Sequence, residues 1–162
     1  MSDGVDSYAS VPACSTMMAG WRETLRGMAF PSHCDHMGHV NNRWYAHFFD
    51  DASMSLWSTI GLSERALQEK FDTSAVIAHT GIDYLHELVA SDQFVVESAF
   101  TRLGGKSLTL KSRLYHVDTR VECARQTMVA VFFDIESRQS VRVPDSIRAL
   151  IEPELVSDDV DN

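Results

Sequence analysis

One short segment holds the residues best suited to chemistry. Residues 35–42 read Asp-His-Met-Gly-His-Val-Asn-Asn, so the carboxylate of Asp35 stands in a glycine-containing loop that runs directly into a helix. The free N–H groups at a helix start carry partial positive charge and can donate to an oxyanion or a polarised carbonyl. Asp35 could act beside them as a base or a nucleophile. This combination of groups is suited to acyl transfer.

The same segment also offers metal ligands. His33, His36 and His39 recur at three-residue spacing with Cys34 among them, and together they could hold zinc. No further Cys or His pair lies at recognisable ligand spacing, so we predict no metal site. His39 could instead line a cleft, and a packed or solvent-facing imidazole is the equal alternative. An isolated Asp before a helix is more often a turn or cap residue, and only the surrounding motif favours a chemical role for Asp35.

The helix that must position this loop is the most strongly patterned one in the chain. Its apolar side chains recur on one stripe at helical spacing: Tyr45, Phe48, Phe49, Ala52, Leu56 and Ile60. Asn41 or Asn42 supplies the N-terminal cap, and Gly61 supplies the left-handed stop. Asp50 and Asp51 are about 100° apart on this helix, so at most one can face a cleft, and a solvated helix face is the competing interpretation.

The remaining elements are mostly strands. A first strand is predicted between Trp21 and Phe30, and one or two helical turns between Ser63 and Lys70. Apolar alternation then predicts four consecutive antiparallel strands, at residues 74–85, 94–103, 108–115 and 121–133. Gly104 and Gly105 form a tight hairpin between the second and third of these. A helix with so apolar a face must be covered by the sheet, which predicts an α+β fold.

Length and composition indicate one domain without a nucleic-acid surface. The 162 residues divide into a flexible leader at 1–19, a single domain at 20–152 and an acidic tail at 153–162. Fourteen basic against twenty-three acidic residues give a net charge of −9, which argues against phosphate-backbone binding. Three widely spaced cysteines suit a reducing, cytoplasmic compartment. The leader lacks the pattern of a signal peptide or membrane span.

The motifs resemble those of one enzyme family. Residues 30–42 and the Tyr-x-x-Phe-Phe-Asp-Asp-Ala pattern of residues 45–52 are similar to the signature of hotdog-fold acyl-CoA thioesterases of the 4-hydroxybenzoyl-CoA thioesterase type. Residues 83–88 and 103–108 are similar to later strands of that family. The resemblance implies a hotdog fold, in which one long central helix is wrapped by an antiparallel sheet of about five strands.

The resemblance also implies a function and a set of site residues. It implies hydrolysis of a small or medium acyl-CoA thioester, and it leaves open whether the acyl group is aromatic or polar. Asp35 matches the catalytic carboxylate, as nucleophile or general base, and the backbone N–H of Asn42 matches the group that polarises the thioester carbonyl. His39 and Tyr45 are assigned to the substrate. No separate cofactor is expected, because coenzyme A is part of the substrate.

Coenzyme A recognition in the resembling family uses basic residues at the hairpin that here contains Lys106 and Ser107. The two positions before them, Gly104 and Gly105, lack basic side chains and depart from the family pattern. The family also implies a homodimer or homotetramer with the active site at a shared interface. Two other functions stay open at this stage: a hotdog hydratase or dehydratase using Asp35 and His39, and a non-catalytic acyl-CoA binder.

Overall fold

The computed structural model describes residues 20–157, which form one sheet and three α-helices. In chain order the elements are β1 (Arg22–Met28), the 3₁₀ helix η1 (Pro31–His33), α1 (Asn42–Thr59), α2 (Glu64–Phe71), β2 (Ser74–Tyr84), β3 (Gln93–Leu103), β4 (Ser107–His116), β5 (Glu122–Asp134), β6 (Gln139–Ser140), α3 (Asp145–Ile151) and the 3₁₀ helix η2 (Glu152–Glu154). The predicted leader and residues 158–162 of the predicted tail lie outside the described residues. Among the described helices, none is long and apolar enough to cross a membrane.

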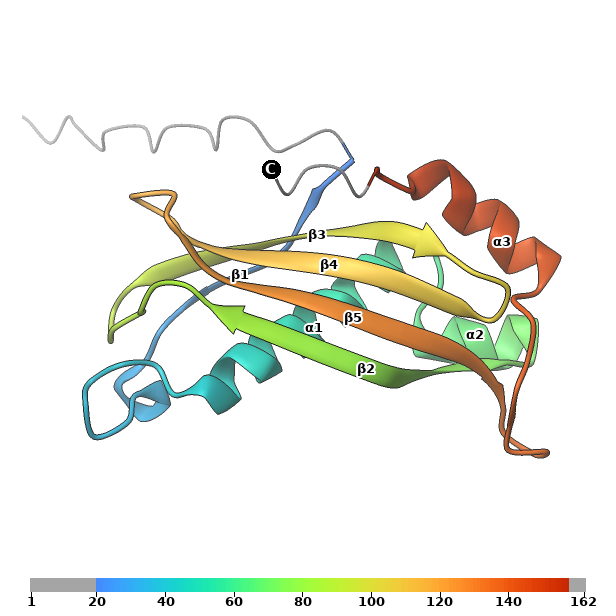
Figure 1. Cartoon of the computed structure of the whole chain (residues 1–162), viewed down its shortest axis with the longest axis horizontal. Coiled ribbons are helices and arrows are strands. Elements are labelled where there is room, and N and C mark those ends of the chain that lie inside the picture. Colours follow the sequence, from blue (N-terminus) through green and yellow to red (C-terminus); the bar gives the residue numbers. More distant parts are fainter. Residues whose placement is uncertain (1–19, 158–162) are drawn as a thin grey trace, which may run out of the picture.

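The sheet is antiparallel, and its strand order is β1-β3-β4-β5-β2, with the short β6 paired to β5 (Figure 1). All five long strands were predicted. The prediction that consecutive strands pair with one another is wrong for β2. This strand pairs with β5, so that Tyr84 lies opposite Ala124, and it forms an edge of the sheet. The reason is that β3 is buried on both faces, as Val95 and Val96 show, and takes the more central place between β1 and β4.

The long helix α1 begins and ends where local signals predict. The side-chain oxygen of Asn41 accepts a hydrogen bond from the backbone N–H of Arg43, which identifies Asn41 as the cap. Gly61 adopts a φ of +76°, the left-handed conformation expected after the last turn. The predicted apolar stripe from Tyr45 to Leu56 is buried, and α1 packs over β1, β3 and β4.

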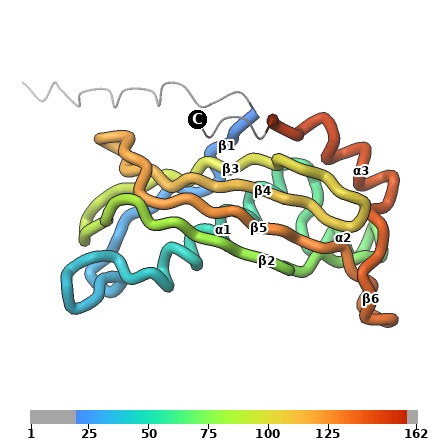
Figure 2. Tube along the Cα trace, viewed as in Figure 1, coloured from blue at the N-terminus to red at the C-terminus, as the bar shows by residue number. Residues whose placement is uncertain are grey.

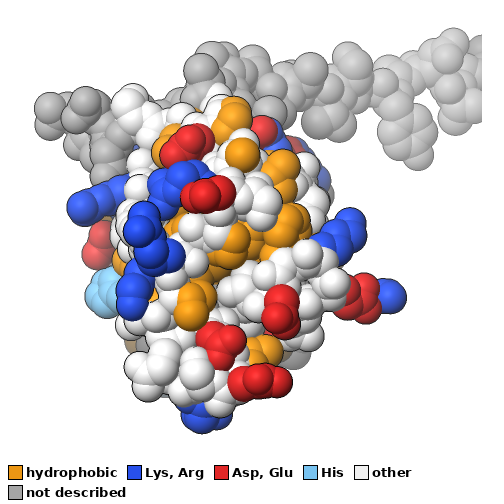
Figure 3. All heavy atoms as spheres, turned by 90° about the vertical axis from the view of Figure 1, so that its right-hand side faces the viewer, with side chains coloured by type: hydrophobic (Ala, Val, Ile, Leu, Met, Phe, Trp, Pro, Cys, Tyr) orange, Lys and Arg blue, Asp and Glu red, His pale blue; other side chains and the backbone are white. Residues whose placement is uncertain are grey.

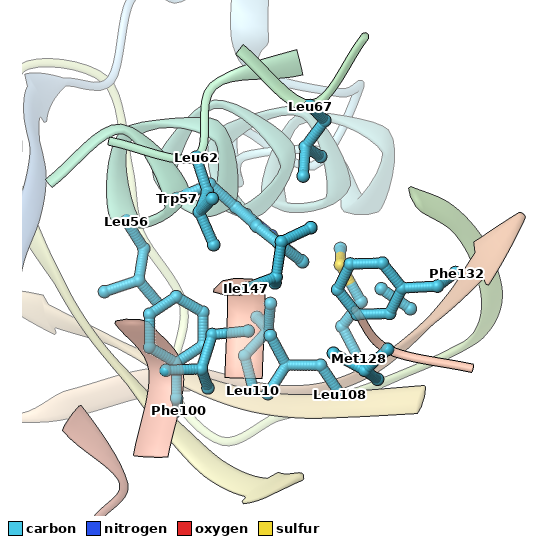
Figure 4. Packing of buried hydrophobic residues seen from close by; sticks show 13 residues of the cluster. Leu56, Trp57, Leu62, Leu67, Phe100, Leu108, Leu110, Met128, Phe132 and Ile147 are labelled. Atoms are coloured by element: carbon cyan, nitrogen blue, oxygen red, sulfur yellow. The ribbon is translucent and has the colours of Figure 1, made fainter. Parts of the chain in front are cut away.

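Two apolar clusters lie between helices and sheet. The cluster under the second half of α1 joins helix residues to the inner face of β3, β4 and β5 (Figure 4), and its labelled members are Leu56, Trp57, Leu62, Leu67, Phe100, Leu108, Leu110, Met128, Phe132 and Ile147. The other lies under the first half of α1 and includes Tyr45, Phe48, Phe49 and Phe94. This second cluster anchors the start of α1, where the Asp35 loop joins it.

Candidate active site

The Asp35 loop is closed by its own hydrogen bonds. The backbone N–H of Asp35 donates to the carbonyl of His39 at 2.9 Å, and the N–H of Gly38 donates to the carbonyl of Asp35 at 3.1 Å. Gly38 adopts a φ of +85°, which other residues rarely tolerate. The N–H of Met37 donates to Oδ1 of Asp35 at 2.8 Å. These bonds orient the carboxylate relative to the loop backbone.

The first turn of α1 stands next to this loop. Asn41 caps the helix and its own N–H donates to the carbonyl of His33 at 2.9 Å, which ties the helix start to η1. Asn42 is the first helical residue, so its N–H has no acceptor within the helix. A carbonyl oxygen placed here would meet a donor and the positive end of the helix dipole.

A cavity of about 310 Å³ brings the two groups together. Its lining includes four of the six residues predicted for the site: Asp35, His39, Asn42 and Tyr45. The opposite wall comes from residues 84–87, at and just beyond the end of β2. The carboxylate and the helix start therefore line one cavity, as acyl transfer at Asp35 requires.

The opposite wall holds residues that the sequence did not assign to the site. Nε2 of His39 lies 3.1 Å from Oε2 of Glu87, so these side chains connect the Asp35 loop to the segment after β2. Nδ1 of His86 lies 2.9 Å from the carbonyl of Glu122 and must donate to it, because a carbonyl can only accept. The similarity of residues 83–88 to a strand of the resembling family pointed to this segment. It did not predict that the segment contacts the Asp35 loop.

Tyr45 forms part of the cavity wall and is mostly buried, with 4% of its surface exposed. Its hydroxyl oxygen accepts a hydrogen bond from the backbone N–H of Leu88 at 3.2 Å. Burial raises the pKa of Tyr45 to about 12. The phenol is therefore neutral at physiological pH, and its visible role is to hold the segment after β2 against α1.

Lys106 and Ser107 do not reach this cavity within one chain. The carbonyl of Lys106 accepts from the N–H of Phe132, which pairs with Ala75 at the start of β2. The cavity lies at the other end of that strand, at Tyr84, roughly 30 Å away at 3.3 Å per residue. The Asp35 loop and the β3–β4 hairpin accordingly stand at opposite ends of the sheet in Figure 2. Nζ of Lys106 donates to the carbonyl of Ser140 at 2.9 Å.

The histidines of the loop serve separate purposes. The His33 ring packs against the Trp44 ring with centroids 4.2 Å apart, and its Nδ1 accepts from the N–H of Phe30. Partial burial, and beyond it the nearby His47, lower the pKa of His33. Within residues 20–157, no group of three His, Cys, Asp or Glu side chains is arranged to hold a metal ion.

Fold and site together define a hotdog-like protein whose longest helix is preceded by a loop that carries the carboxylate of Asp35. A sequence profile of the thioesterase-like superfamily matches residues 30–151, which include this loop, α1 and every later strand. The chain belongs to the thioesterase-like superfamily. The match concerns the superfamily as a whole and does not single out the 4-hydroxybenzoyl-CoA type that the motifs resemble. Comparison with curated proteins gave no match.

Solved structures show the same fold. A thioesterase-superfamily protein of Jannaschia superposes with a TM-score of 0.74 at 21% identity, over 82% of this chain and 92% of its own. A Staphylococcus aureus protein solved in complex with CoA gives a TM-score of 0.74 at 20% identity, over 86% and 87%. A Pseudomonas aeruginosa protein proposed to be a thioesterase gives 0.67 at 29% identity, over 80% and 97%.

Proposed function

We propose that this protein is an acyl-CoA thioesterase, which hydrolyses a small or medium acyl thioester to the free acid and coenzyme A. The observation that carries the proposal is the single cavity lined by Asp35 and by Asn42, the first residue of α1. Membership of the thioesterase-like superfamily supports this chemistry. The CoA complex of the Staphylococcus aureus neighbour supports a CoA thioester as the ligand.

The proposed reaction uses two groups of the cavity. The thioester carbonyl oxygen faces the N–H of Asn42, where one preorganised donor stabilises the developing oxyanion by roughly 3–4 kcal/mol in comparable enzymes. Asp35 either takes a proton from the attacking water or attacks the carbonyl carbon itself, giving a mixed anhydride that water then hydrolyses. In both routes the C–S bond breaks, and the thiolate leaves with the bonding electrons and is protonated. His39 and Tyr45 contact the substrate from the cavity wall.

A second copy of the chain completes the proposed site. The strand β2 is an eleven-residue edge on which Val76 and Ile77 are 42% and 55% exposed, and such an edge readily pairs with another strand. Antiparallel pairing of β2 with β2 of a partner about a two-fold axis sets the start of one strand beside the end of the other. Lys106 and Ser107 of the partner subunit then come toward the Asp35 cavity, where they bind the phosphates of coenzyme A.

The test is release of free thiol from a panel of short, long, aromatic and charged acyl-CoA thioesters. Wild type and Asp35→Asn are compared side by side. We expect hydrolysis of at least one class, with a loss of about a hundredfold or more in the variant because the base or nucleophile is removed. Unchanged folding and assembly of Asp35→Asn is the control. Saturable acyl-CoA binding without turnover by wild type would refute the proposed activity and indicate a binding protein.

A further inference from the structure

Most histidines of the chain gather at the end of the sheet that holds the Asp35 cavity. They are His33, His36 and His39 around the Asp35 loop, His47 on α1, His86 after β2 and His116 at the end of β4. The opposite end of the molecule, which carries α2 and α3, shows charged side chains around an apolar middle (Figure 3). Imidazole is the side chain that most readily gains and loses a proton near neutral pH. The end with the Asp35 cavity therefore holds the groups best suited to proton transfer.

The backbone and the ring of His86 are both tied to the start of β5. The backbone N–H of His86 donates to the carbonyl of Cys123 at 3.0 Å, and Nδ1 of its ring donates to the carbonyl of Glu122 at 2.9 Å. In a neutral imidazole whose Nδ1 carries the proton, Nε2 holds a lone pair and accepts. Nε2 of His86 has no hydrogen-bond partner among the described residues. The ring is therefore held in place with one basic nitrogen free.

This ring borders two cavities. His86 lines the Asp35 cavity together with Leu85 and Glu87, and the same three residues line a second cavity of about 450 Å³. A water molecule takes up about 30 Å³ in the liquid, so the second cavity has room for several. Water can therefore reach the ring of His86 from the second cavity while an acyl-CoA occupies the Asp35 cavity.

The other imidazoles that line these two cavities are engaged differently. His39 lines the Asp35 cavity, and its Nε2 lies 3.1 Å from Oε2 of Glu87. His116 lines only the second cavity. Its Nδ1 accepts from two backbone N–H groups of the turn after β4, and its Nε2 lies 3.5 Å from Oδ1 of Asp92. At the Asp35 cavity, His86 is thus the imidazole that a main-chain carbonyl orients and whose Nε2 is free.

We infer that His86 is a second catalytic residue of the proposed thioesterase, the general base for the water that hydrolyses an acyl group carried by Asp35. This inference rests on the proposed function, and it makes Asp35 the nucleophile. General-base catalysis is most efficient when the base titrates near the working pH, as imidazole does. With an oriented imidazole in the same cavity, the carboxylate of Asp35 is left to attack the thioester.

The reaction then has two steps. A carboxylate oxygen of Asp35 attacks the thioester carbon, the C–S bond breaks, and coenzyme A leaves as the thiolate with the bonding electrons. Water attacks the same carbon of the resulting mixed anhydride, while Nε2 of His86 takes a proton from that water. The bond between the acyl carbon and Asp35 breaks, which restores the carboxylate and releases the free acid. His86 passes its proton to the thiolate, so the enzyme returns to its starting state.

The test uses His86→Asn. The amide nitrogen of Asn stands as many bonds from Cβ as Nδ1 of His, so this variant keeps a donor for the carbonyl of Glu122 and loses Nε2. The probe is the thioester of the panel that wild type hydrolyses fastest, with hexanoyl-CoA tried first. We expect a burst of about one thiol per active site, followed by turnover about a hundredfold slower than in wild type. Mass spectrometry of the acid-quenched variant should show the added acyl group, and imidazole in the buffer should raise its turnover by about tenfold.

Two control variants accompany this test. The double variant Asp35→Asn/His86→Asn should show neither the burst nor the added mass, because the nucleophile is absent. His47→Gln removes an imidazole that is exposed on α1 and lines neither cavity, and it should match wild type.

The outcomes separate the two proposals. Wild-type turnover by His86→Asn overturns the role of His86, and so does slow turnover without the burst and the added acyl mass, which a merely structural role would give. Accumulation of the acyl group in His39→Asn but not in His86→Asn overturns it as well. Each of these results leaves the proposed function standing, because wild type hydrolyses the thioester in all of them. If wild type hydrolyses no thioester of the panel, both proposals fail.

Discussion

At the scale of single residues, Tyr45 links the wall of the Asp35 cavity to the chain beyond β2. Replacing it with Phe removes the acceptor for the buried N–H of Leu88, which we expect to cost about 1–3 kcal/mol of unfolding free energy. The phenol has a folded pKa of about 12 against an ordinary 10, so its stabilisation is complete below pH 10 and is lost as pH rises to 12.

Chemical denaturation between pH 8 and 12 measures both effects. Across the upper two pH units, wild type should lose up to about 2–3 kcal/mol through this residue, whereas Tyr45→Phe lacks that contribution. The raised pKa of Tyr115 affects both proteins alike, whereas the Cys123 thiol interacts by charge with Tyr45, so the difference between the two curves measures Tyr45 together with that interaction. Parallel curves across this range would show that the phenol titrates as it does in the unfolded chain.

A second residue-scale prediction concerns the contact between His39 and Glu87. Both side chains are partly exposed, so Glu87→Gln should change the unfolding free energy by no more than about 1 kcal/mol. We expect a larger effect on turnover, a fall in kcat of roughly tenfold, because the pair positions the loop that carries Asp35. Thiol release and thermal unfolding are measured on the same preparations. Glu136→Gln, in the exposed loop after β5, is the control. Equal kcat values in Glu87→Gln and Glu136→Gln would show that His39 and Glu87 do not position the loop that carries Asp35.

At the scale of elements, the start of α1 is the point on which the site depends. Asn41→Ala removes the side chain that accepts from the N–H of Arg43, and loss of such a cap costs about 1 kcal/mol. Because the neighbouring Asn42 lines the cavity and its N–H is the proposed donor to the thioester carbonyl, we also expect kcat to fall by about tenfold. Asn41→Ser retains a capping oxygen and should restore both values. Full activity in Asn41→Ala at temperatures where it is folded would contradict the role of the helix start.

The elements also show what could be predicted from sequence. The Asp35 loop and α1 were found because capping, helical spacing and a left-handed glycine are local signals, as Asn41 and Gly61 illustrate. The place of β2 was not found, because the partner of an antiparallel strand is decided by contacts distant in sequence. The same limit hid Glu87, which meets His39 only after β2 has paired with β5.

At the scale of the whole molecule, the main feature that could not be predicted from the sequence is the large distance between Lys106 and Asp35. A motif assigns both residues to one site, yet the length of the sheet separates them within one chain. Either the family pattern does not apply to Lys106, or two copies must meet so that opposite ends of their sheets adjoin. The exposed edge of β2 favours the second explanation, since it leaves apolar side chains and backbone groups unpaired.

The dimer can therefore be tested at the middle of β2, close to the expected two-fold axis. Thr80 is exposed in the single chain, so Thr80→Asp should leave the fold intact while setting two carboxylates near each other in the pair. We expect sedimentation to show the mass of one chain for the variant and of at least two for wild type. Activity should fall by about a hundredfold, because the Lys106 hairpin of a second copy would then not reach the Asp35 cavity. Ser137→Asp adds the same charge in the loop after β5 and should remain assembled and active. A Thr80→Asp variant that is monomeric and fully active would show that one chain holds a complete site, and Lys106 would then have no part in it.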